Sequence, residues 1–221
     1  MNAAFLFSGQ LRGFPLCING LKNNLFSSFE SYDTFFYIPD IDLKLLTDNW
    51  LPTSVLAERD QIHPDISNYN NNITYSNSKL QRNGYPLLGR MQHYYLQWYG
   101  VKRVFELFDK YRSIQNINYD VIFRIRADII VTEKFNYTPF NGITIPNHEG
   151  YSGLYDRFAF GPYEHMKYYC SKYDNFNNIT HITGLGNSES KLKQHIDLKN
   201  IPVRFVSLPH CRLNKDGSIQ P

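Results

Sequence analysis

The first forty residues contain a strand, a helix and a second strand, and this order constrains the fold more than any other feature. Ala3 to Phe7 is an apolar run that ends at Ser8-Gly9, which is typical of a buried strand. Apolar residues recur at helical spacing from Leu16 to Phe29, and residues 33–38 form a second apolar run before Pro39. Such a unit predicts two parallel strands joined by a right-handed crossover. We therefore expect an α/β sandwich of three layers around a mostly parallel central sheet.

The rest of the chain continues this alternation of strands and helices. Apolar residues spaced by three and four predict a long helix over 91–111, and a buried strand over 119–126 follows it. Residues 60–85 are rich in Asn, Ser and Asp, so we expect a surface excursion there. The remaining expected elements are strands at 143–146, 157–161 and 203–208, and helices at 164–173 and 188–200.

Composition and charge exclude several classes of protein. A formal net charge of +3 is too small to predict a nucleic-acid partner. The three cysteines form no C-x-x-C motif, so neither a zinc knuckle nor a disulfide framework is indicated. We find no signal-peptide pattern and no apolar run of the roughly 18 residues that a membrane span needs. We expect a cytoplasmic protein with reduced thiols and no membrane span.

The end of the strand at 119–126 carries the strongest functional signal. Arg124, Arg126 and Asp128 alternate along the chain, so an extended strand would direct all three side chains to one face. Ligands bind parallel sheets at the carboxyl ends of strands. Arginines there can bind phosphate oxygens, and a carboxylate can hold a divalent cation. The alternative is an Arg126–Asp128 ion pair that only closes the strand.

The loop after the first strand is a second candidate site. It reads Ser8-Gly9-Gln10-Leu11-Arg12-Gly13, and its small residues would let the backbone approach a ligand. Arg12 adds a cation, and the following helix N-terminus favours anions. The spacing matches neither G-x-G-x-x-G nor a P-loop. A plain tight turn explains the loop equally well.

Four segments in order resemble one enzyme family. Residues 7–12, the strand at 119–128, the Asp-Arg-Phe-Ala-Phe-Gly run at 156–161 and Ser-Glu-Ser at 188–190 are similar to single-domain GT-A nucleotide-sugar glycosyltransferases, particularly short ones from polysaccharide gene clusters and large DNA viruses. The resemblance implies a Rossmann-related fold in one domain over 1–221. Its first half (1–130) would bind the nucleotide sugar and its second half (131–221) the acceptor.

The resemblance also implies roles for individual residues. Ser8, Gly9, Gln10, Arg12 and Arg124 would contact the nucleotide or diphosphate. The family's Asp-x-Asp metal motif falls on residues 126–128, where Arg126 replaces the first aspartate. Asp128 would then contact Mn²⁺ or Mg²⁺, or the diphosphate itself, and Arg126 would share in neutralising the diphosphate.

The second half supplies the predicted acceptor and metal residues. Asp156 would bond the acceptor or act as a general base; the alternative is a turn carboxylate paired with Arg157. Glu189 lies in the first turn of a predicted helix, where the ionised form is stabilised and basicity is lowered; helix capping alone would also explain it. His210, near the end of the sequence, would be a metal ligand.

In the first half, Arg90 and Gln92 would complete the donor pocket.

The expected function is transfer of a sugar from a nucleotide-diphosphate donor to a glycan hydroxyl. Two alternatives stay open. A carbohydrate-binding protein without catalysis would use the many aromatic residues, 17 Tyr and 16 Phe, as stacking surfaces for sugars. A nucleotidyl or phosphoryl transferase would use the same arginine and aspartate residues but consume a nucleoside triphosphate.

Overall fold

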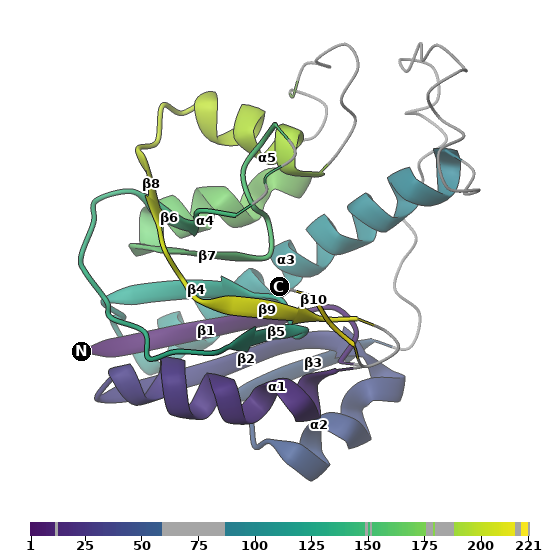
Figure 1. Cartoon of the computed structure of the whole chain (residues 1–221), viewed down its shortest axis with the longest axis vertical. Helices are drawn as coiled ribbons and strands as arrows, with labels where there is room; N and C mark the ends of the chain where they lie inside the picture. The colour runs from purple at the N-terminus through teal and green to yellow at the C-terminus, as the bar shows by residue number, and fades with distance from the viewer. Residues whose placement is uncertain are drawn as a thin grey trace.

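The computed structural model describes residues 1–11, 13–58, 87–148, 150, 152–175, 179, 188–214 and 218–220, with side chains omitted at 87–95 and 220. Strands and helices alternate along the chain (Figure 1). The strands are β1 (Asn2–Ser8), β2 (Ser31–Pro39), β3 (Ser54–Glu58), β4 (Val121–Ile125), β5 (Ile129–Val131), β6 (Ile143–Pro146), β7 (Phe158–Gly161), β8 (Val203–Val206), β9 (His210–Leu213) and β10 (Ile219–Gln220). The α-helices are α1 (Phe14–Gly20), α2 (Leu43–Asn49), α3 (Leu87–Gln115), α4 (Tyr163–Cys170) and α5 (Ser188–Asp197).

A seven-stranded sheet in the order β3-β2-β1-β4-β7-β6-β8 forms the centre of the fold. β1 pairs in parallel with both β2 and β4, β2 with β3, and β6 with β8. Only β7, among the described strands of this sheet, runs antiparallel to its neighbours β4 and β6. The expected α/β fold with a mostly parallel sheet is therefore confirmed. A second sheet of three short strands has the order β10-β9-β5.

Helices cover both faces of the central sheet. Figure 1 shows α1 and α2 on one side and α3, α4 and α5 on the other. On the α1 side, the ring of Phe5 stacks on Phe123 at 4.8 Å between centroids. On the opposite side, Phe35 packs edge-on against Phe108 of α3 at 5.3 Å. Alternate residues of each strand thus enter two different cores, as the two-residue period of a strand requires.

The first crossover is less regular than predicted. α1 ends at Gly20 and continues as a π-helical turn (Leu21–Leu25) and a 3₁₀ turn (Phe26–Ser28). Leu16, which we expected on the buried stripe, is 65% exposed. It lies two positions before the buried Ile18, which places it on the other side of the helix.

Some elements were not predicted. α2, β3 and the small sheet are absent from the sequence prediction, because each is short and its apolar pattern spans few residues. The strand expected at 119–126 ends one residue early, at Ile125, and a turn follows in which the Ile129 amide donates to the Arg126 carbonyl at 3.2 Å. The excursion expected at 60–85 lies outside the described residues.

Two further expectations concern cysteines and membranes. Cys17, Cys170 and Cys211 are all free thiols, as the sequence predicted. Within the described residues, no helix combines the length and apolar character that crossing a membrane requires.

Candidate functional site

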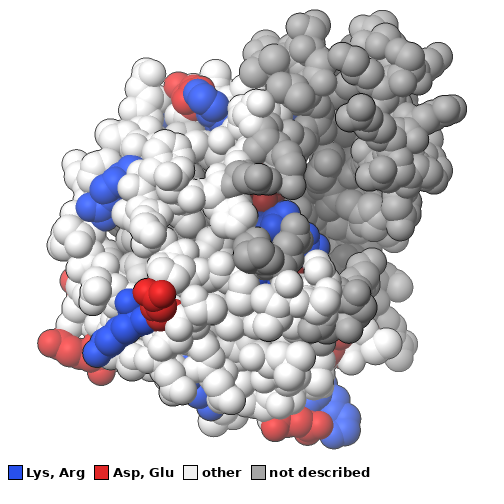
Figure 2. All heavy atoms as spheres, viewed as in Figure 1, with Lys and Arg blue, Asp and Glu red and all other residues white. Residues whose placement is uncertain are grey.

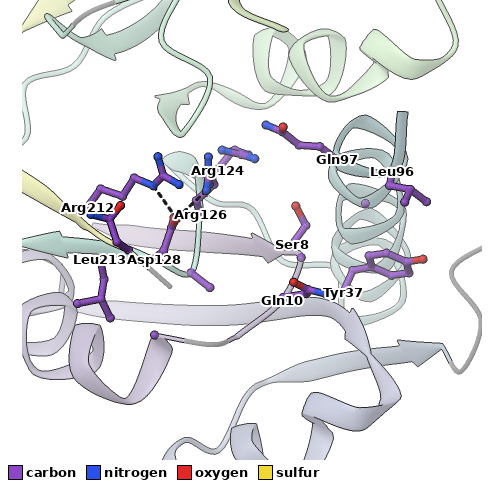
Figure 3. A pocket seen from close by; sticks show the side chains of 15 residues that line it. Ser8, Gln10, Tyr37, Leu96, Gln97, Arg124, Arg126, Asp128, Arg212 and Leu213 are labelled. Carbon is purple, nitrogen blue, oxygen red and sulfur yellow. Dashed lines mark hydrogen bonds and ion pairs between the residues drawn. The ribbon is translucent and has the colours of Figure 1, made fainter. Parts of the chain in front are cut away.

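A cavity of about 420 Å³ opens at the carboxyl ends of β1 and β4 (Figure 3). The chain proceeds from β1 to β2 and β3 on one side, whereas β4 lies on the other side of β1. This reversal of strand order is a topological switch point, the place where open parallel sheets bind ligands. The cavity is lined by Ser8, Gly9, Gln10, Gly13, Tyr37, Leu96, Gln97, Gly100, Arg124, Arg126, Ala127, Asp128, Arg212, Leu213 and Asn214.

The loop after β1 forms one wall of this cavity. Gly9 has a φ of +104°, a conformation that side chains with a Cβ rarely adopt. Its amide donates to the Tyr37 carbonyl at 3.0 Å, and the Leu11 amide donates to the Asp42 carboxylate at 2.9 Å. The Ser8 hydroxyl is buried and has no hydrogen-bond partner among the described residues. Arg12 lies outside the described residues.

Two arginines converge on Asp128 at the opposite wall (Figure 3). Arg126 Nη2 donates to Asp128 Oδ2 at 2.6 Å, and Arg212 Nε donates to the same oxygen at 3.3 Å. The other oxygen, Oδ1, is buried without a partner in the described part of the chain. All three side chains are partly exposed to the cavity. The Arg126–Asp128 pair that we considered as a strand closure is present, but it faces a cavity and includes a second guanidinium.

Pairing between distant strands positions Arg212. β5 pairs antiparallel with β9, so Ile129 faces Arg212, and the Leu213 amide donates to the Asp128 carbonyl at 2.9 Å. Arg212 therefore reaches the cavity from the last part of the chain. Figure 2 shows basic atoms recessed near the middle of one face.

A buried polar network lies behind Arg124 and Gln97, which line another part of the cavity. Arg124 is 1% exposed, and its Nη1 donates to the Asp156 carbonyl. The Asp156 carboxylate accepts hydrogen bonds from Gln97 Nε2 at 2.8 Å and from the Ser188 hydroxyl at 2.5 Å. Asp156 thus binds two residues that line the cavity, Arg124 and Gln97. Its carboxylate forms hydrogen bonds to other protein groups, namely Gln97 and Ser188. Its predicted contact with an acceptor stays a prediction.

Opposite charges keep Asp156 ionised inside the protein. Burial alone would raise the pKa of this carboxyl, but the charges of Lys172 and Arg124 and the Ser188 hydrogen bond outweigh it, so the pKa is lowered. Burial, opposed by Asp156 and reinforced by Arg124, lowers the pKa of Lys172 to about 7. The Lys172 ammonium lies 4.0 Å from the centre of the Trp98 ring.

Glu189 lies in the first turn of α5 beside this network, but it does not line the cavity. Burial raises its pKa, and the negative charge of Asp156 adds to the effect. The pKa is therefore raised and not lowered as we expected, because burial and Asp156 outweigh the backbone hydrogen bond at Glu189 and the charges of Arg157 and Lys172. A carboxylate with a raised pKa is a better proton acceptor near neutral pH.

His210 does not line the cavity, and both of its ring nitrogens form hydrogen bonds. Its Nε2 bonds to the Tyr155 hydroxyl at 2.8 Å and its Nδ1 bonds to the Leu208 carbonyl at 2.7 Å. Burial lowers the pKa of its imidazole. Both ring nitrogens of His210 bond to protein groups, and its role as a metal ligand stays a prediction.

The residues at Asp128 do not fit a divalent cation. Mn²⁺ and Mg²⁺ need several oxygen ligands, and Asp128 is the one carboxylate among the described residues that line the cavity. Its Oδ2 already accepts hydrogen bonds from two cations. In the described part of the chain, no group of three or more His, Cys, Asp or Glu could hold a metal ion.

Most residues predicted for donor binding meet in this cavity. Ser8, Gly9, Gln10, Arg124, Arg126 and Asp128 line it, and Asp156 lies directly behind it. The side chains of Arg90 and Gln92 lie outside the described residues. Sequence reasoning missed Arg212, Gln97 and Tyr37. A polar Gln97 next to the buried Trp98 was a weak signal in the helical pattern, whereas Arg212 had none.

Comparison with known proteins identifies the family. A family described as a domain of unknown function (DUF7796) matches residues 6–218. The chain belongs to the DUF7796 family. No curated protein matches this DUF7796 chain in sequence. In structure it is similar to the apo-form glycosyltransferase GlyE of Streptococcus pneumoniae TIGR4, with 7% sequence identity and a TM-score of 0.47. The alignment covers 91% of the DUF7796 chain and 44% of the GlyE chain, so the DUF7796 chain spans less than half of that protein.

Proposed function

We propose that this protein is a glycosyltransferase, which moves a sugar from a nucleoside-diphosphate donor to a hydroxyl group of a glycan. The observation that carries the proposal is the cavity at the switch point between β1 and β4. Three of its lining residues are arginines, and two of its buried oxygens, Ser8 Oγ and Asp128 Oδ1, have no partner among the described residues. Buried polar atoms are normally satisfied, so unpartnered ones at a cavity support a polar ligand.

The donor would lie across the ends of both strands. Ser8, Gly9 and Gln10 would contact the nucleotide from the β1 side, because Gly9 lets the backbone approach closely. Arg12 would join them from the same loop. Arg124, Arg126 and Asp128 would form the diphosphate side, where guanidinium groups bind phosphate oxygens in a fork.

The reaction would exchange one carbon–oxygen bond for another. The acceptor hydroxyl oxygen forms a bond to the anomeric carbon of the sugar, and the bond from that carbon to the terminal phosphate oxygen breaks. The electron pair of the broken bond leaves with the nucleoside diphosphate. The hydroxyl proton passes to a carboxylate. The arginines would stabilise the charge that develops on the leaving phosphate.

Glu189, in the first turn of α5 beside the Asp156 network, stays the candidate for that carboxylate that the sequence predicted. Its pKa is raised by burial and by Asp156, so it would accept a proton more readily than an exposed glutamate. Asp156 would act mainly by positioning, since its carboxylate binds Gln97 and Ser188. The acceptor side would be formed by the second half of the chain, and polysaccharide synthesis in the cytoplasm is the setting that we predict.

A thermal-shift panel of UDP-, GDP-, CMP- and dTDP-sugars tests the proposal. A ligand that binds the native state raises the melting temperature by mass action. One class of nucleoside-diphosphate sugar should raise it in the wild type and fail to do so in Asp128→Ala, and the same sugar nucleotide should release its nucleoside diphosphate when a glycan acceptor is added.

Other outcomes would contradict the proposal. A shift with nucleoside triphosphates alone would favour nucleotidyl or phosphoryl transfer. A shift with free glycans alone, unchanged in Asp128→Ala, would favour a carbohydrate-binding protein without catalysis.

A further inference from the structure

We infer that Arg126 and Arg212, held by Asp128, bind the diphosphate of the donor and do the work for which related transferases would use a divalent cation. The inference rests on the proposed function for the identity of the ligand. Its structural basis is the cluster itself, in which one guanidinium group from the turn after β4 and one from β9 meet on one carboxylate oxygen (Figure 3).

The charge of the cluster opposes a bound dication. Two arginines and one aspartate leave an excess of one positive charge, whereas the charge of Arg124 is offset by Asp156. A dication on Asp128 would lie beside these fixed charges in a partly buried site, where repulsion is stronger than in water. A diphosphate, by contrast, brings the negative charge that the cluster lacks.

The arginines retain donors for a second anion. Each guanidinium carries five N–H groups in a rigid fork. The bonds to Asp128 use Nη2 of Arg126 and Nε of Arg212. Both side chains are partly exposed, at 26% for Arg126 and 32% for Arg212, so a ligand in the cavity can reach them.

Asp128 is a positioning residue in this account. Arginine side chains lose rotational freedom when they bind a ligand, which weakens binding. A bond to a fixed carboxylate orders the side chain before the ligand arrives and so reduces this entropic cost. The Asp128 backbone is itself held by the Leu213 amide, one residue beyond Arg212. The turn after β4 and the strand β9 are thus joined both by this backbone hydrogen bond and by the Arg212–Asp128 ion pair.

Calorimetric titration with inorganic pyrophosphate, UDP, GDP, CDP and dTDP tests the inference. Each titration is made in excess EDTA and again with Mn²⁺. Pyrophosphate and one nucleoside diphosphate should bind in EDTA, with affinity changed less than about threefold by Mn²⁺. Arg212→Gln should weaken both ligands by about 10- to 100-fold, the expected loss of charged hydrogen bonds. The matching nucleoside monophosphate should be affected less than about threefold.

Two further variants control for folding and for total charge. Arg112→Gln removes an arginine that pairs with Asp109 on α3 and does not line the cavity, so it should leave pyrophosphate binding unchanged. Arg212→Lys keeps the charge without the planar fork, and its affinity should lie between those of the wild type and Arg212→Gln.

The two proposals fail in different ways. Diphosphate binding that requires Mn²⁺, or that is equal in Arg212→Gln and wild type, would overturn the arginine account and leave sugar transfer standing. Absence of binding by every nucleoside diphosphate, with and without Mn²⁺, would overturn both.

Discussion

Gln97 donates a hydrogen bond of 2.8 Å from its Nε2 to Oδ2 of Asp156, and this bond joins the wall of the cavity to the interior of the protein. Because the amide nitrogen of Gln97 points to the protein interior, its amide oxygen is left as a hydrogen-bond acceptor for the cavity. The same aspartate accepts from Ser188 at the start of α5. Helices α3 and α5 and the loop before β7 are therefore linked at one buried carboxylate.

Asp156→Asn should destabilise the protein strongly. Loss of the negative charge leaves Arg124 and Lys172 buried without their counter-charge, which costs about 3–5 kcal/mol. Urea unfolding measures the change. Asp197→Asn is the matched control, because Asp197 forms an exposed i,i+4 pair with Lys193 and its loss should cost less than about 0.5 kcal/mol. Equal effects of the two substitutions would contradict the role assigned to Asp156.

Gly9→Ala should reduce stability through the backbone alone. A Cβ at Gly9 would meet no atom within 4 Å, so crowding is not the cause, but its φ of +104° disfavours any side chain. We expect a loss of about 1–2 kcal/mol by urea unfolding. Gly9→Asn should lose less, because asparagine tolerates positive φ better than alanine. The reverse order would show that the loop adopts another conformation.

Stability should fall when the protein is acidified, in part because of His195. This imidazole is fully buried, stacks on the Tyr168 ring at 4.2 Å and bonds through Nε2 to the Tyr168 carbonyl. Burial, together with the charge of Lys172, lowers its pKa from 6.5 to about 4. Between these two values the unfolded chain binds a proton at His195 and the native state does not. The contribution of His195 to stability is therefore fully present above pH 6.5 and is lost as the pH falls toward 4.

The size of this effect is measurable by comparison with His195→Gln. Complete loss of the His195 contribution corresponds to about 3 kcal/mol. Urea unfolding across this pH range should show a steeper decline for the wild type than for the variant, which cannot titrate at that position. Parallel declines would mean that His195 is not the titrating group.

Glu189→Gln should remove the acid limb of the pH–rate profile. If Glu189 accepts the acceptor proton, transfer requires its ionised form, and activity rises with pH through a pKa above the usual 4.5. The variant should lose about 100- to 10,000-fold in rate with little change in donor affinity. Glu164→Gln, at an exposed glutamate in the first turn of α4, should retain wild-type activity and profile.

The sequence predicted those parts of the fold that have a clear apolar pattern. β1, β2, α3 and β4 are long or fully buried, so their periodicity is visible in single stretches of sequence. β3 and α2 were missed because β3 is only half-buried and α2 has one buried side chain, Leu46.

The candidate site was predictable where it follows the ends of strands. Ser8, Gly9 and Asp128 each lie just beyond an apolar run, and strand ends mark ligand sites without knowledge of distant contacts. Arg212 could not be predicted, because it reaches the cavity through the pairing of β5 with β9, and the register of two short strands cannot be read from either one. The expected alternation of Arg124, Arg126 and Asp128 also did not apply, since the chain turns after Ile125.

The most direct test of the account is a crystal structure with the nucleoside diphosphate that raises the melting temperature most. The account predicts both phosphates in the cavity between β1 and β4, with oxygens within hydrogen-bond distance of Arg126 and Arg212 and the nucleoside against the loop after β1. A nucleotide bound elsewhere on the protein, or phosphates in the cavity that contact neither arginine, would contradict it.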